Sequence, residues 1–295
     1  MSSQGIFAPV RPAYITQNFL RSFIQSAFHE DVGEGDHSTL ASIPPDATST
    51  ARLLVKDTGI LAGVEVATEI LSQVDKGVAI EVLLKDGSAI KPGDIAFIVK
   101  GPARSILTAE RLVLNCMQRM SAIATKTHHY KNLIAGTRAQ LLDTRKTTPN
   151  FRLLEKWAVL IGGGKNHRIG LFDMIMLKDN HVDMAGGVSA AINRTKDYLR
   201  AINKKLPVEV ETRNLAEVEE VLRNSGVDII MLDNMDLKTM RAAVSLINGR
   251  CKTEASGGVT EETIRAIAEC GVDYISVGAL THTVKSLDLS LKAAD

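Results

Sequence analysis

The chain has 295 residues, 45% of them apolar and 23% charged, which is the profile of a soluble globular protein with one large core or two smaller ones. Its formal net charge of +1 excludes an overall field that would draw it to nucleic acid or to an anionic membrane. Any anion must therefore be bound by a local cluster of cations.

The three cysteines, Cys116, Cys251 and Cys270, lie far apart and lack the spacing of metal ligands. An odd number of cysteines without a disulfide framework is typical of a reducing cytoplasm. The start, MSSQGIFAPV, lacks the features of a secretory signal, and no apolar run approaches the ~20 residues of a membrane helix. The sequence therefore predicts a cytoplasmic protein.

The first part of the chain, residues 1–125, mixes helical and strand-like patterns. Apolar residues at helical spacing predict helices over 17–31 and 63–74. The strand-like segments, bounded by turn sequences, are 50–59, 78–90 and 94–103. We expect a mixed α/β domain here, followed by a long helix over 107–136 that ends on Gly136.

The second part, residues 126–295, alternates strand and helix with short connections. The strand-like segments are 139–145, 173–180, 206–212, 227–234, 251–256 and 272–279. Helical patterns separate the later strands at 214–226, 236–249 and 260–271. This alternation indicates a parallel sheet, either in an α/β barrel with fewer than eight strands or in a doubly wound open sheet.

The ends of these strands favour the barrel. Each strand has polar residues or glycine at its C-terminal end: Arg145 and Lys146, Lys178 and Asn180, Glu209 and Glu211, Asp233 and Asn234, Glu254 and Ser256, and Gly278. In α/β barrels this end carries the active site. An open sheet binds ligands only beside its topological switch point, not at every strand.

Several cations are expected at this end of the barrel. They are Arg145, Lys146, Lys178 and, after a glycine-rich turn, His167 and Arg168. Arginine offers a planar fork to a carboxylate or phosphate, and lysine acts as a point charge. Single cations of this kind are mostly solvated surface charges, but their convergence predicts a site for an anion with several charged groups.

Two loops resemble phosphate cradles. Ser256–Val259 follows the fifth strand and Ser276–Thr281 follows the sixth. The last two loops of a barrel frequently bind phosphate through backbone N–H groups and a helix N-terminus, although glycine pairs also occur in ordinary turns.

Carboxylates accompany the cations. Glu209 and Glu211 alternate with valines on one strand, so both should point into the barrel, with Glu211 nearer its mouth. Asp233 ends the next strand. Such carboxylates could stabilise positive charge on a sugar ring, help to hold a metal, or form internal ion pairs with Lys146 and Lys178.

The order of these motifs resembles the quinolinate phosphoribosyltransferase family. The matching motifs are DTRKTTP (143–149), GGGKNHR (162–168), LKDNH (177–181), VEVET (208–212), LDN (232–234), EASGG (254–258) and SVGALT (276–281). The resemblance extends upstream to EDVGEGD (30–36) and ERLVLNCMQRMSAIAT (110–125). It thus covers nearly the whole chain.

The resemblance implies an N-terminal α/β domain (1–125) and an irregular, TIM-like α/β barrel of six or seven strands (126–295). It implies the reaction of quinolinate with 5-phosphoribosyl 1-diphosphate to give nicotinate mononucleotide, pyrophosphate and CO2, with substrate-associated Mg²⁺ and no organic cofactor. It also implies a homodimer with shared active sites and leaves open whether dimers form hexamers. Neither nucleic acid nor a membrane is an implied partner.

The resemblance also implies residue roles. Thr144, Arg145, His167 and Arg168 would bind quinolinate, together with Arg111 from the other subunit. Lys146 and Lys178 would neutralise the pyrophosphate and the departing carboxylate. Glu211 and Asp233 would face the ribose and its metal, directly or through water. Ser256, Gly257, Gly258, Gly278 and Ala279 would cradle the 5-phosphate. Asn150, Ala122 and the sequence GDHST depart from the commonest family pattern without touching a charged contact.

Two alternatives come from other functional classes. A barrel lyase or aldolase could use Lys146 or Lys178 as a Schiff-base nucleophile. A non-catalytic, transport-associated homologue could bind a phosphate ligand on a similar fold, but it need not keep Glu211 and Asp233 beside the cations.

Overall fold

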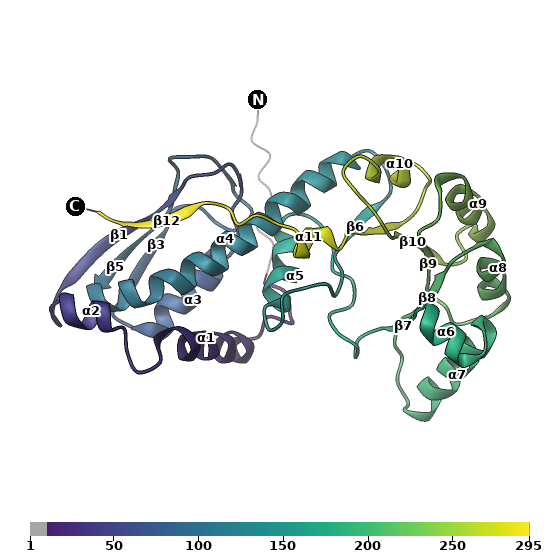
Figure 1. Ribbon diagram of the computed structural model, residues 1–295, viewed down its shortest axis with the longest axis horizontal. Coiled ribbons are helices and arrows are strands. Elements are labelled where there is room, and N and C mark those ends of the chain that lie inside the picture. The colour runs from purple at the N-terminus through teal and green to yellow at the C-terminus, as the bar shows by residue number, and fades with distance from the viewer. Residues whose placement is uncertain (1–10, 295) are drawn as a thin grey trace. The chain divides into compact units, whose positions relative to one another are not determined.

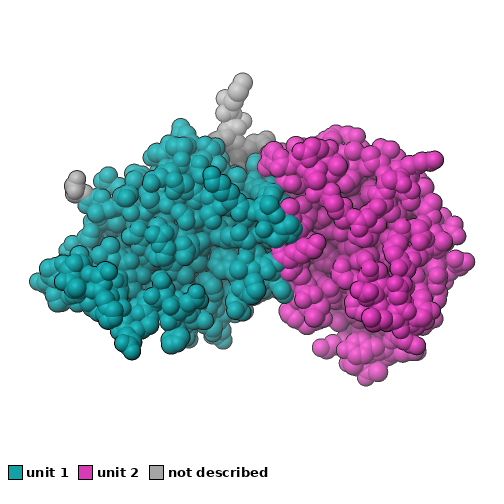
Figure 2. Space-filling model, in the orientation of Figure 1, with its two compact units in different colours: residues 1–128, 147–163, 280–295 teal, residues 129–146, 164–279 magenta. Residues whose placement is uncertain are grey.

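The computed structural model describes residues 11–294 (Figure 1). The segment in which a secretory signal is not expected, residues 1–10, lies outside the described residues. The chain folds into two compact units, coloured separately in Figure 2. Unit 1 contains the chain up to residue 128, residues 147–163 and the chain from 280 on, and unit 2 contains residues 129–146 and 164–279.

Unit 1 is built on an antiparallel sheet in the order β12-β1-β5-β3. Its strands are β1 (Thr48–Val55), β3 (Ala79–Val82), β5 (Ile95–Pro102) and β12 (Leu289–Ala293). The first three confirm predicted strands, with Ala51, Leu53 and Val55 of β1 buried at the period of two expected for one covered face. The pairing of β12 with β1 was not predicted and brings the C-terminal part of the chain into this sheet.

Of the helices that lie in unit 1 or enter it, those over 17–32, 64–74 and 103–133 confirm predicted helices, whereas those over 37–42 and 152–161 were not predicted. The helices are α1 (Gln17–Val32), α2 (His37–Ser42), α3 (Val64–Val74) and α5 (Arg152–Ile161), and α4 (Ala103–Leu133) extends from unit 1 into unit 2. Two short strands, β2 (Gly59–Ile60) and β4 (Ala89–Ile90), pair with each other. Thr16 caps the start of α1 by accepting a hydrogen bond from the Phe19 N–H at 3.1 Å.

Unit 2 is built on a parallel sheet of six strands, all at predicted positions. The strands are β6 (Gln140–Leu142), β7 (Ile175–Leu177), β8 (Val208–Thr212), β9 (Ile229–Asp233), β10 (Lys252–Ser256) and β11 (Tyr274–Ser276). Their order is β6-β11-β10-β9-β8-β7, so each strand from β7 to β11 pairs with the next, and the last pairs with the first. This cyclic order is that of a barrel, and it excludes the doubly wound sheet, in which the order reverses.

The barrel is irregular between β6 and β7. Among residues 11–294 no strand ladder joins these two strands. A parallel bridge from Leu142 to Lys165 instead places the segment before His167 along the free edge of β6. The GGGKNHR segment therefore runs beside the first strand and brings its side chains to the barrel.

Helices follow the strands of unit 2 and lie on the outside of the sheet, as α8 and α9 do in Figure 1. They are α6 (Asp179–Ala185), α7 (Val188–Ala201), α8 (Leu215–Arg223), α9 (Leu237–Ile247) and α10 (Ile264–Ala268), and α11 (Ala279–His282) follows β11. α10 is shorter than predicted because the Thr260 N–H donates to Thr263 Oγ1 at 2.9 Å, in a turn that precedes the helix.

The two units differ from the sequence-based domains at two segments. Residues 147–163 and the chain from 280 on belong to unit 1, whereas the sequence pattern placed both in the barrel domain. The pairing of β12 with β1 explains the second difference. The boundary near residue 125 stays a prediction. None of the helices within residues 11–294 combines the length and apolar character needed to cross a membrane.

Candidate active site

The inner side of β8 carries two buried carboxylates. All five residues of this strand are buried, with Glu209 0% and Glu211 8% exposed. The alternating valines, Val208 and Val210, occupy the opposite side of the strand, as the period of two requires. Charged groups are almost never buried without partners, so the neighbours of these carboxylates define what the barrel interior does.

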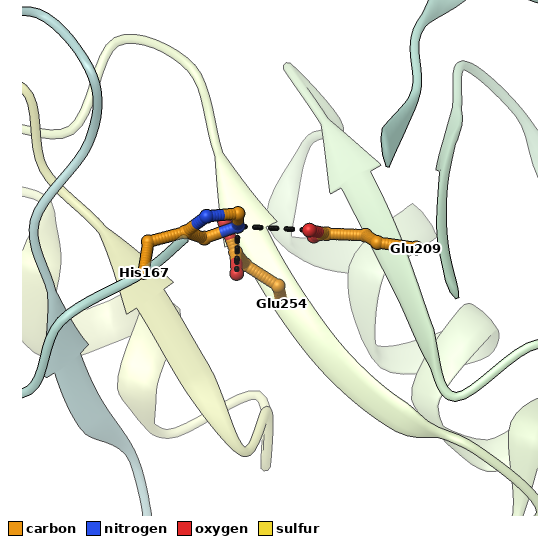
Figure 3. Close-up of side chains that lie close together, drawn as sticks. All are labelled: His167, Glu209 and Glu254. Atoms are coloured by element: carbon orange, nitrogen blue, oxygen red, sulfur yellow. Dashed lines mark hydrogen bonds and ion pairs between the residues drawn. The ribbon is translucent and has the colours of Figure 1, made fainter. Parts of the chain in front are cut away.

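His167 lies between two buried carboxylates, one of them from β8 (Figure 3). Its Nε2 is 2.8 Å from Oε2 of Glu209 on β8 and 3.5 Å from Oε2 of Glu254 on β10. The imidazole is 7% exposed and both glutamates are 0% exposed. A segment outside the strands and two strands of the barrel thus meet at one imidazole.

The hydrogen bonds of His167 fix its tautomer. The backbone N–H of Arg168 donates to Nδ1 at 2.7 Å, so Nδ1 acts as an acceptor and carries no proton. Nε2 therefore carries the proton and donates it to Glu209. In this tautomer Nε2 donates to Glu209 at 2.8 Å and lies farther from Glu254, at 3.5 Å.

Burial raises the pKa values of both glutamates. The pKa of Glu209 rises to about 7 because the carboxyl is desolvated, although Arg168 opposes the shift. The pKa of Glu254 rises to about 8 because of burial and then the charge of Glu209. Neither oxygen of Glu254 has a well-formed hydrogen bond within the described residues. Near neutral pH the pair therefore retains a proton rather than two full negative charges.

Asp143, at the end of β6, holds the segment that contains His167. Its Oδ1 accepts the His167 N–H at 2.8 Å and its Oδ2 accepts the side-chain amide of Asn166 at 2.7 Å. Asp143 is 0% exposed, so these bonds lie in a dry environment where they are strong. One carboxylate thereby links the strand that leads to Arg145 with the segment that leads to Arg168.

Arg145 and Arg168 lie close enough for their charges to interact. Burial, and after it the positive charge of Arg145, lowers the pKa of the Arg168 guanidinium. Arg168 is 9% exposed, and its Nη1 donates to the Met174 carbonyl at 3.4 Å. Two guanidinium groups in a sheltered place repel each other. An anion bound between them offsets this repulsion and accepts hydrogen bonds from both.

Lys178 and Glu211 form an ion pair at the C-terminal ends of β7 and β8. Lys178 Nζ is 3.3 Å from Glu211 Oε2. The lysine side chain is 49% exposed and the glutamate 8%, so the pair spans the boundary between the interior and the solvent. Internal ion pairing of these strand ends, one of the alternatives derived from the sequence, is therefore present.

Lys146, Thr144 and Arg111 are less constrained. Lys146 is exposed, and its backbone N–H donates to Thr144 Oγ1 at 3.0 Å, which makes a tight turn after β6. Arg111 is an exposed residue of α4 in unit 1, whereas the other predicted site residues belong to unit 2. The contribution of Arg111 to an active site stays a prediction.

The loops after β9 and β10 meet through their backbones. The Asn234 N–H donates to the Ser256 carbonyl at 2.9 Å, and the Asn234 side-chain amide donates to Asp233 Oδ2 at 2.7 Å. Gly257 and Gly258 have φ values of 92° and 58°, which favour glycine. Gly278 and Ala279 follow β11, next to β10 in the sheet. The predicted phosphate residues thus follow two neighbouring strands of one sheet.

Two sets of side chains could act as metal ligands. Within residues 11–294, His167, Glu209 and Glu254 form a group whose ligand atoms all lie within 4.8 Å of one another. A hydrogen bond of 2.8 Å already joins His167 to Glu209. Mg²⁺ prefers oxygen ligands and keeps several waters, so it does not suit this closed site with a nitrogen donor. The strand-end carboxylates Glu211 and Asp233 offer only oxygen and fit Mg²⁺ better.

The sequence pattern did not reveal the roles of three buried acids. Asp143 and Glu254 stood out only as strand residues, and Glu209 was grouped with Glu211. Their contacts with His167 cross between segments far apart in the sequence. Strand alternation could have indicated that Glu209 and Glu254 face one interior, but not that His167 lies between them.

Comparison with known families gives matches over most of the chain. Residues 36–121 match the family model of the quinolinate phosphoribosyl transferase N-terminal domain. Residues 123–292 match that of the quinolinate phosphoribosyl transferase C-terminal domain.

Named relatives and solved structures agree with these matches. A chloroplastic nicotinate-nucleotide pyrophosphorylase (carboxylating) from Oryza sativa subsp. japonica is 48% identical over 99% of this chain and 82% of its own. A probable nicotinate-nucleotide pyrophosphorylase (carboxylating) from Bacillus subtilis is 41% identical over 92% of each chain. The crystal structure of NadC from Streptococcus pyogenes superposes with a TM-score of 0.89 at 40% identity, covering 95% of this chain and 99% of that chain.

Proposed function

The chain belongs to the quinolinate phosphoribosyl transferase family, and we propose that the strand ends of its barrel are the active site for this family's reaction. The enzyme transfers a phosphoribosyl group from 5-phosphoribosyl 1-diphosphate (PRPP) to quinolinate. Decarboxylation then gives nicotinate mononucleotide, with pyrophosphate and CO2 as the other products. This is a step of NAD biosynthesis.

The gathering of the predicted site residues at β8 is the observation that carries this proposal, because His167 contacts Glu209 and Lys178 contacts Glu211 on this one strand. Arg168 lies in the same sheltered part of the barrel, where burial, and after it the repulsion by the positive charge of Arg145, lowers its pKa. A dicarboxylate such as quinolinate would relieve the repulsion and could engage each guanidinium through two parallel hydrogen bonds. Thr144 and His167 complete the proposed quinolinate site, although both ring nitrogens of His167 are already engaged.

Lys146 and Lys178 are proposed to bring the two polyanions together. Like charges oppose the encounter of quinolinate with PRPP in water, and fixed cations remove that penalty without reorganising during the reaction. Lys178 is anchored by Glu211 but half exposed, so its ammonium can also reach a ligand. The departing pyrophosphate and the carboxylate to be lost are the groups that these lysines would neutralise.

Glu211 and Asp233 are proposed to face the ribose. As pyrophosphate leaves, the anomeric carbon gains positive charge, which nearby carboxylates stabilise. The same two residues would hold Mg²⁺ directly or through water, and the metal would neutralise the pyrophosphate. After transfer, the pyridinium ring accepts the electrons released by loss of CO2, so we propose that no organic cofactor takes part.

The glycine-rich loops are proposed to bind the 5-phosphate of PRPP. Ser256 lies beside Asp233 in the register of β10 and β9. Gly257 and Gly258 turn the chain through the left-handed region, and such turns allow successive backbone N–H groups to converge on an anion. Gly278 and Ala279 would contribute from the neighbouring strand end.

We propose that the chain forms a homodimer in which Arg111 enters the active site of the other subunit. The exposure of Arg111 on α4 supports this assignment, because a site residue of one subunit must be accessible to the next. We further propose the cytoplasm as its compartment, which the free thiols of Cys116, Cys251 and Cys270 support.

A purified-protein assay tests the proposed function. Pyrophosphate release from PRPP should depend on quinolinate and on Mg²⁺, and nicotinate mononucleotide should accumulate with it. Nicotinate, which lacks the second carboxylate, should replace quinolinate very poorly. Release that proceeds equally well with nicotinate, or not at all with quinolinate, would contradict the proposal.

A further inference from the structure

Hydrogen bonds from different directions meet at His167. Its backbone N–H donates to Asp143 at 2.8 Å, its Nε2–H donates to Glu209 at 2.8 Å, and its Nδ1 accepts the Arg168 N–H at 2.7 Å. The first bond fixes the chain before the imidazole and the third fixes the chain after it. The second fixes the direction of the imidazole itself.

The third bond makes the direction of Arg168 depend on the imidazole. The Arg168 N–H can reach Nδ1 only while the ring keeps its present rotation, and this N–H sets the peptide plane from which the arginine side chain leaves. The ring in turn keeps its rotation because Nε2–H points at Glu209. A chain of two hydrogen bonds thus connects a buried strand residue to a guanidinium.

We propose that Glu209 is a positioning residue that acts through His167 to aim Arg168 at the quinolinate carboxylates, which extends the function proposed above. Glu209 is fully buried behind the imidazole and therefore does not itself reach the ligand. In this role, Glu209 accepts the hydrogen bond from His167 Nε2–H in a fixed direction. Glu209 rather than Glu254 is the acceptor, since its carboxylate is 2.8 Å from Nε2 and that of Glu254 lies 0.7 Å farther away, at 3.5 Å.

A spectroscopic experiment on the unmodified chain tests the hydrogen-bond chain without reference to activity. Nitrogen-15 NMR of the full-length protein should show His167 as the neutral Nε2–H tautomer, whose ring-nitrogen shifts differ clearly from those of the Nδ1–H tautomer. Observation of the Nδ1–H tautomer would overturn the proposal, because the Arg168 N–H could then not be held by the imidazole.

Kinetics of Glu209 variants test the consequence. Glu209→Ala should raise KM for quinolinate by about 10-fold or more while KM for PRPP changes less than about 3-fold, because only the dicarboxylate site is disturbed. Glu209→Gln should stay within about 3-fold of the unmodified enzyme, because its amide oxygen still accepts from Nε2–H. An equal loss in Glu209→Gln and Glu209→Ala, or equal changes in both KM values, would refute the positioning role.

A double variant separates action through His167 from a direct effect. If Glu209 acts only through the imidazole, Glu209→Ala combined with His167→Ala should be no worse than His167→Ala alone. Multiplied losses would show that Glu209 acts independently. Glu220→Ala is the matched control, since Glu220 accepts hydrogen bonds from Ser189 on the outer helices and should not affect KM for quinolinate.

The outcomes for the two proposals are distinguishable. An unmodified enzyme that releases no pyrophosphate with quinolinate would refute the proposed function and leave the tautomer result intact. An active enzyme whose Glu209 variants behave like the Glu220 control would refute the positioning role alone. If Glu209→Ala does not fold, the tautomer measurement and the kinetics of Glu209→Gln still decide.

Discussion

Gly257 packs so closely against Asn234 that a Cβ atom at Gly257 would lie 2.1 Å from Oδ1 of Asn234. Contacts under 3.0 Å are essentially never seen for real Cβ atoms, so one of the two residues would have to move. Asn234 is itself constrained by its bonds to Ser256 and Asp233, and its φ of 52° is unusual for a residue other than glycine. The loops after β9 and β10 therefore shape each other.

Gly257→Ala should accordingly raise KM for PRPP by about 10-fold and destabilise the protein by about 1 to 3 kcal/mol, because the clash adds to the strain of φ 92°. Steady-state kinetics and thermal unfolding measure the two effects. Gly258→Ala is the control: its φ is 58° but a Cβ there meets nothing within 4 Å, so it should cost only about 1 kcal/mol of strain. Equal effects of the two variants would contradict the importance of the contact with Asn234.

Lys178 should be required for turnover rather than for folding. Lys178→Ala removes a partner of the buried Glu211 carboxylate, but the lysine is 49% exposed and water can take the place of its ammonium, so we expect a small change in stability. Loss of a fixed cation beside the reacting groups should lower kcat by about 100-fold or more. Lys252→Ala removes a similar ion pair, with Asp273, from the opposite end of β10, and it should leave kcat within about 2-fold. A comparable loss in both variants would indicate a general electrostatic effect.

Much of the barrel could be predicted because its signals are local. Strands such as Val208–Thr212 follow a simple alternation, and helices such as α9 start at a side chain, Asp236, that accepts backbone N–H groups at 2.8 and 2.9 Å. Strand-end polarity then identified the edge of the sheet where Lys178 and Glu211 meet.

Other features depend on contacts that the sequence does not encode locally. The strand β12, near the C-terminus, pairs with β1 from the first part of the chain, and nothing in its own sequence identifies that partner. Glu254 lies on the same kind of strand as Glu211, yet it is 0% exposed and faces His167 instead of a lysine. The closure of the barrel decides which partner lies next to each buried acid. The residue pattern along a single strand therefore cannot predict these pairings.

Glu155 should make a large contribution to the stability of unit 1. It is 0% exposed and accepts from Arg119 Nη2 at 2.8 Å and from both the N–H and the Oγ1 of Thr148, at 3.1 and 2.9 Å. In Glu155→Gln, the side-chain NH2 group would face the N–H and O–H donors of Arg119 and Thr148, and the N–H groups could not accept its hydrogens. We expect the unfolding free energy to fall by roughly 2 to 4 kcal/mol, with some reduction of this loss because Arg119 is 25% exposed. Thermal unfolding checks this, with Glu269→Gln as the control.

The control is informative because Glu269 pairs with Arg265 at 2.6 Å, but both side chains are about half exposed. Exposed pairs contribute about 0 to 1 kcal/mol, so Glu269→Gln should have little effect. A similar small loss for Glu155→Gln would mean that Arg119 and Thr148 find new partners in water.

Glu254 should give the protein a stability that falls as pH rises. Its pKa is raised from 4.5 to about 8 in the folded state, so between these values the folded chain binds a proton that the unfolded chain has lost. The unfolding free energy therefore decreases with pH across this window, and the stabilisation by the proton is lost above the folded pKa. Glu209, whose pKa is raised to about 7, adds to the same slope.

Glu254→Gln removes one of these titrations, so its melting temperature should fall less between pH 5 and pH 9 than that of the unmodified protein. Calorimetry at several pH values measures the difference. Glu220→Gln is a suitable control, because hydrogen bonds from Ser189 lower the pKa of Glu220 and confine its effect to acid pH. Parallel pH profiles for Glu254→Gln and the unmodified protein would show that Glu254 is not protonated when folded.

Arg111 and Arg145 should complement each other if active sites are shared between subunits. Arg111 lies on α4 in unit 1 and Arg145 follows β6 in unit 2, so a shared site would take them from different copies of the chain. Arg111→Ala and Arg145→Ala should each lower kcat/KM by about 100-fold or more.

After subunit exchange, mixed dimers would hold one site with both arginines intact, and activity should approach a quarter of that of the unmodified enzyme at statistical mixing. Exchange must be shown independently, for example by mass spectrometry of differently labelled chains. If mixed dimers form but no activity returns, both arginines belong to the same subunit's site. In that case each site of a mixed dimer would lack one of the two arginines, and no complete site could form.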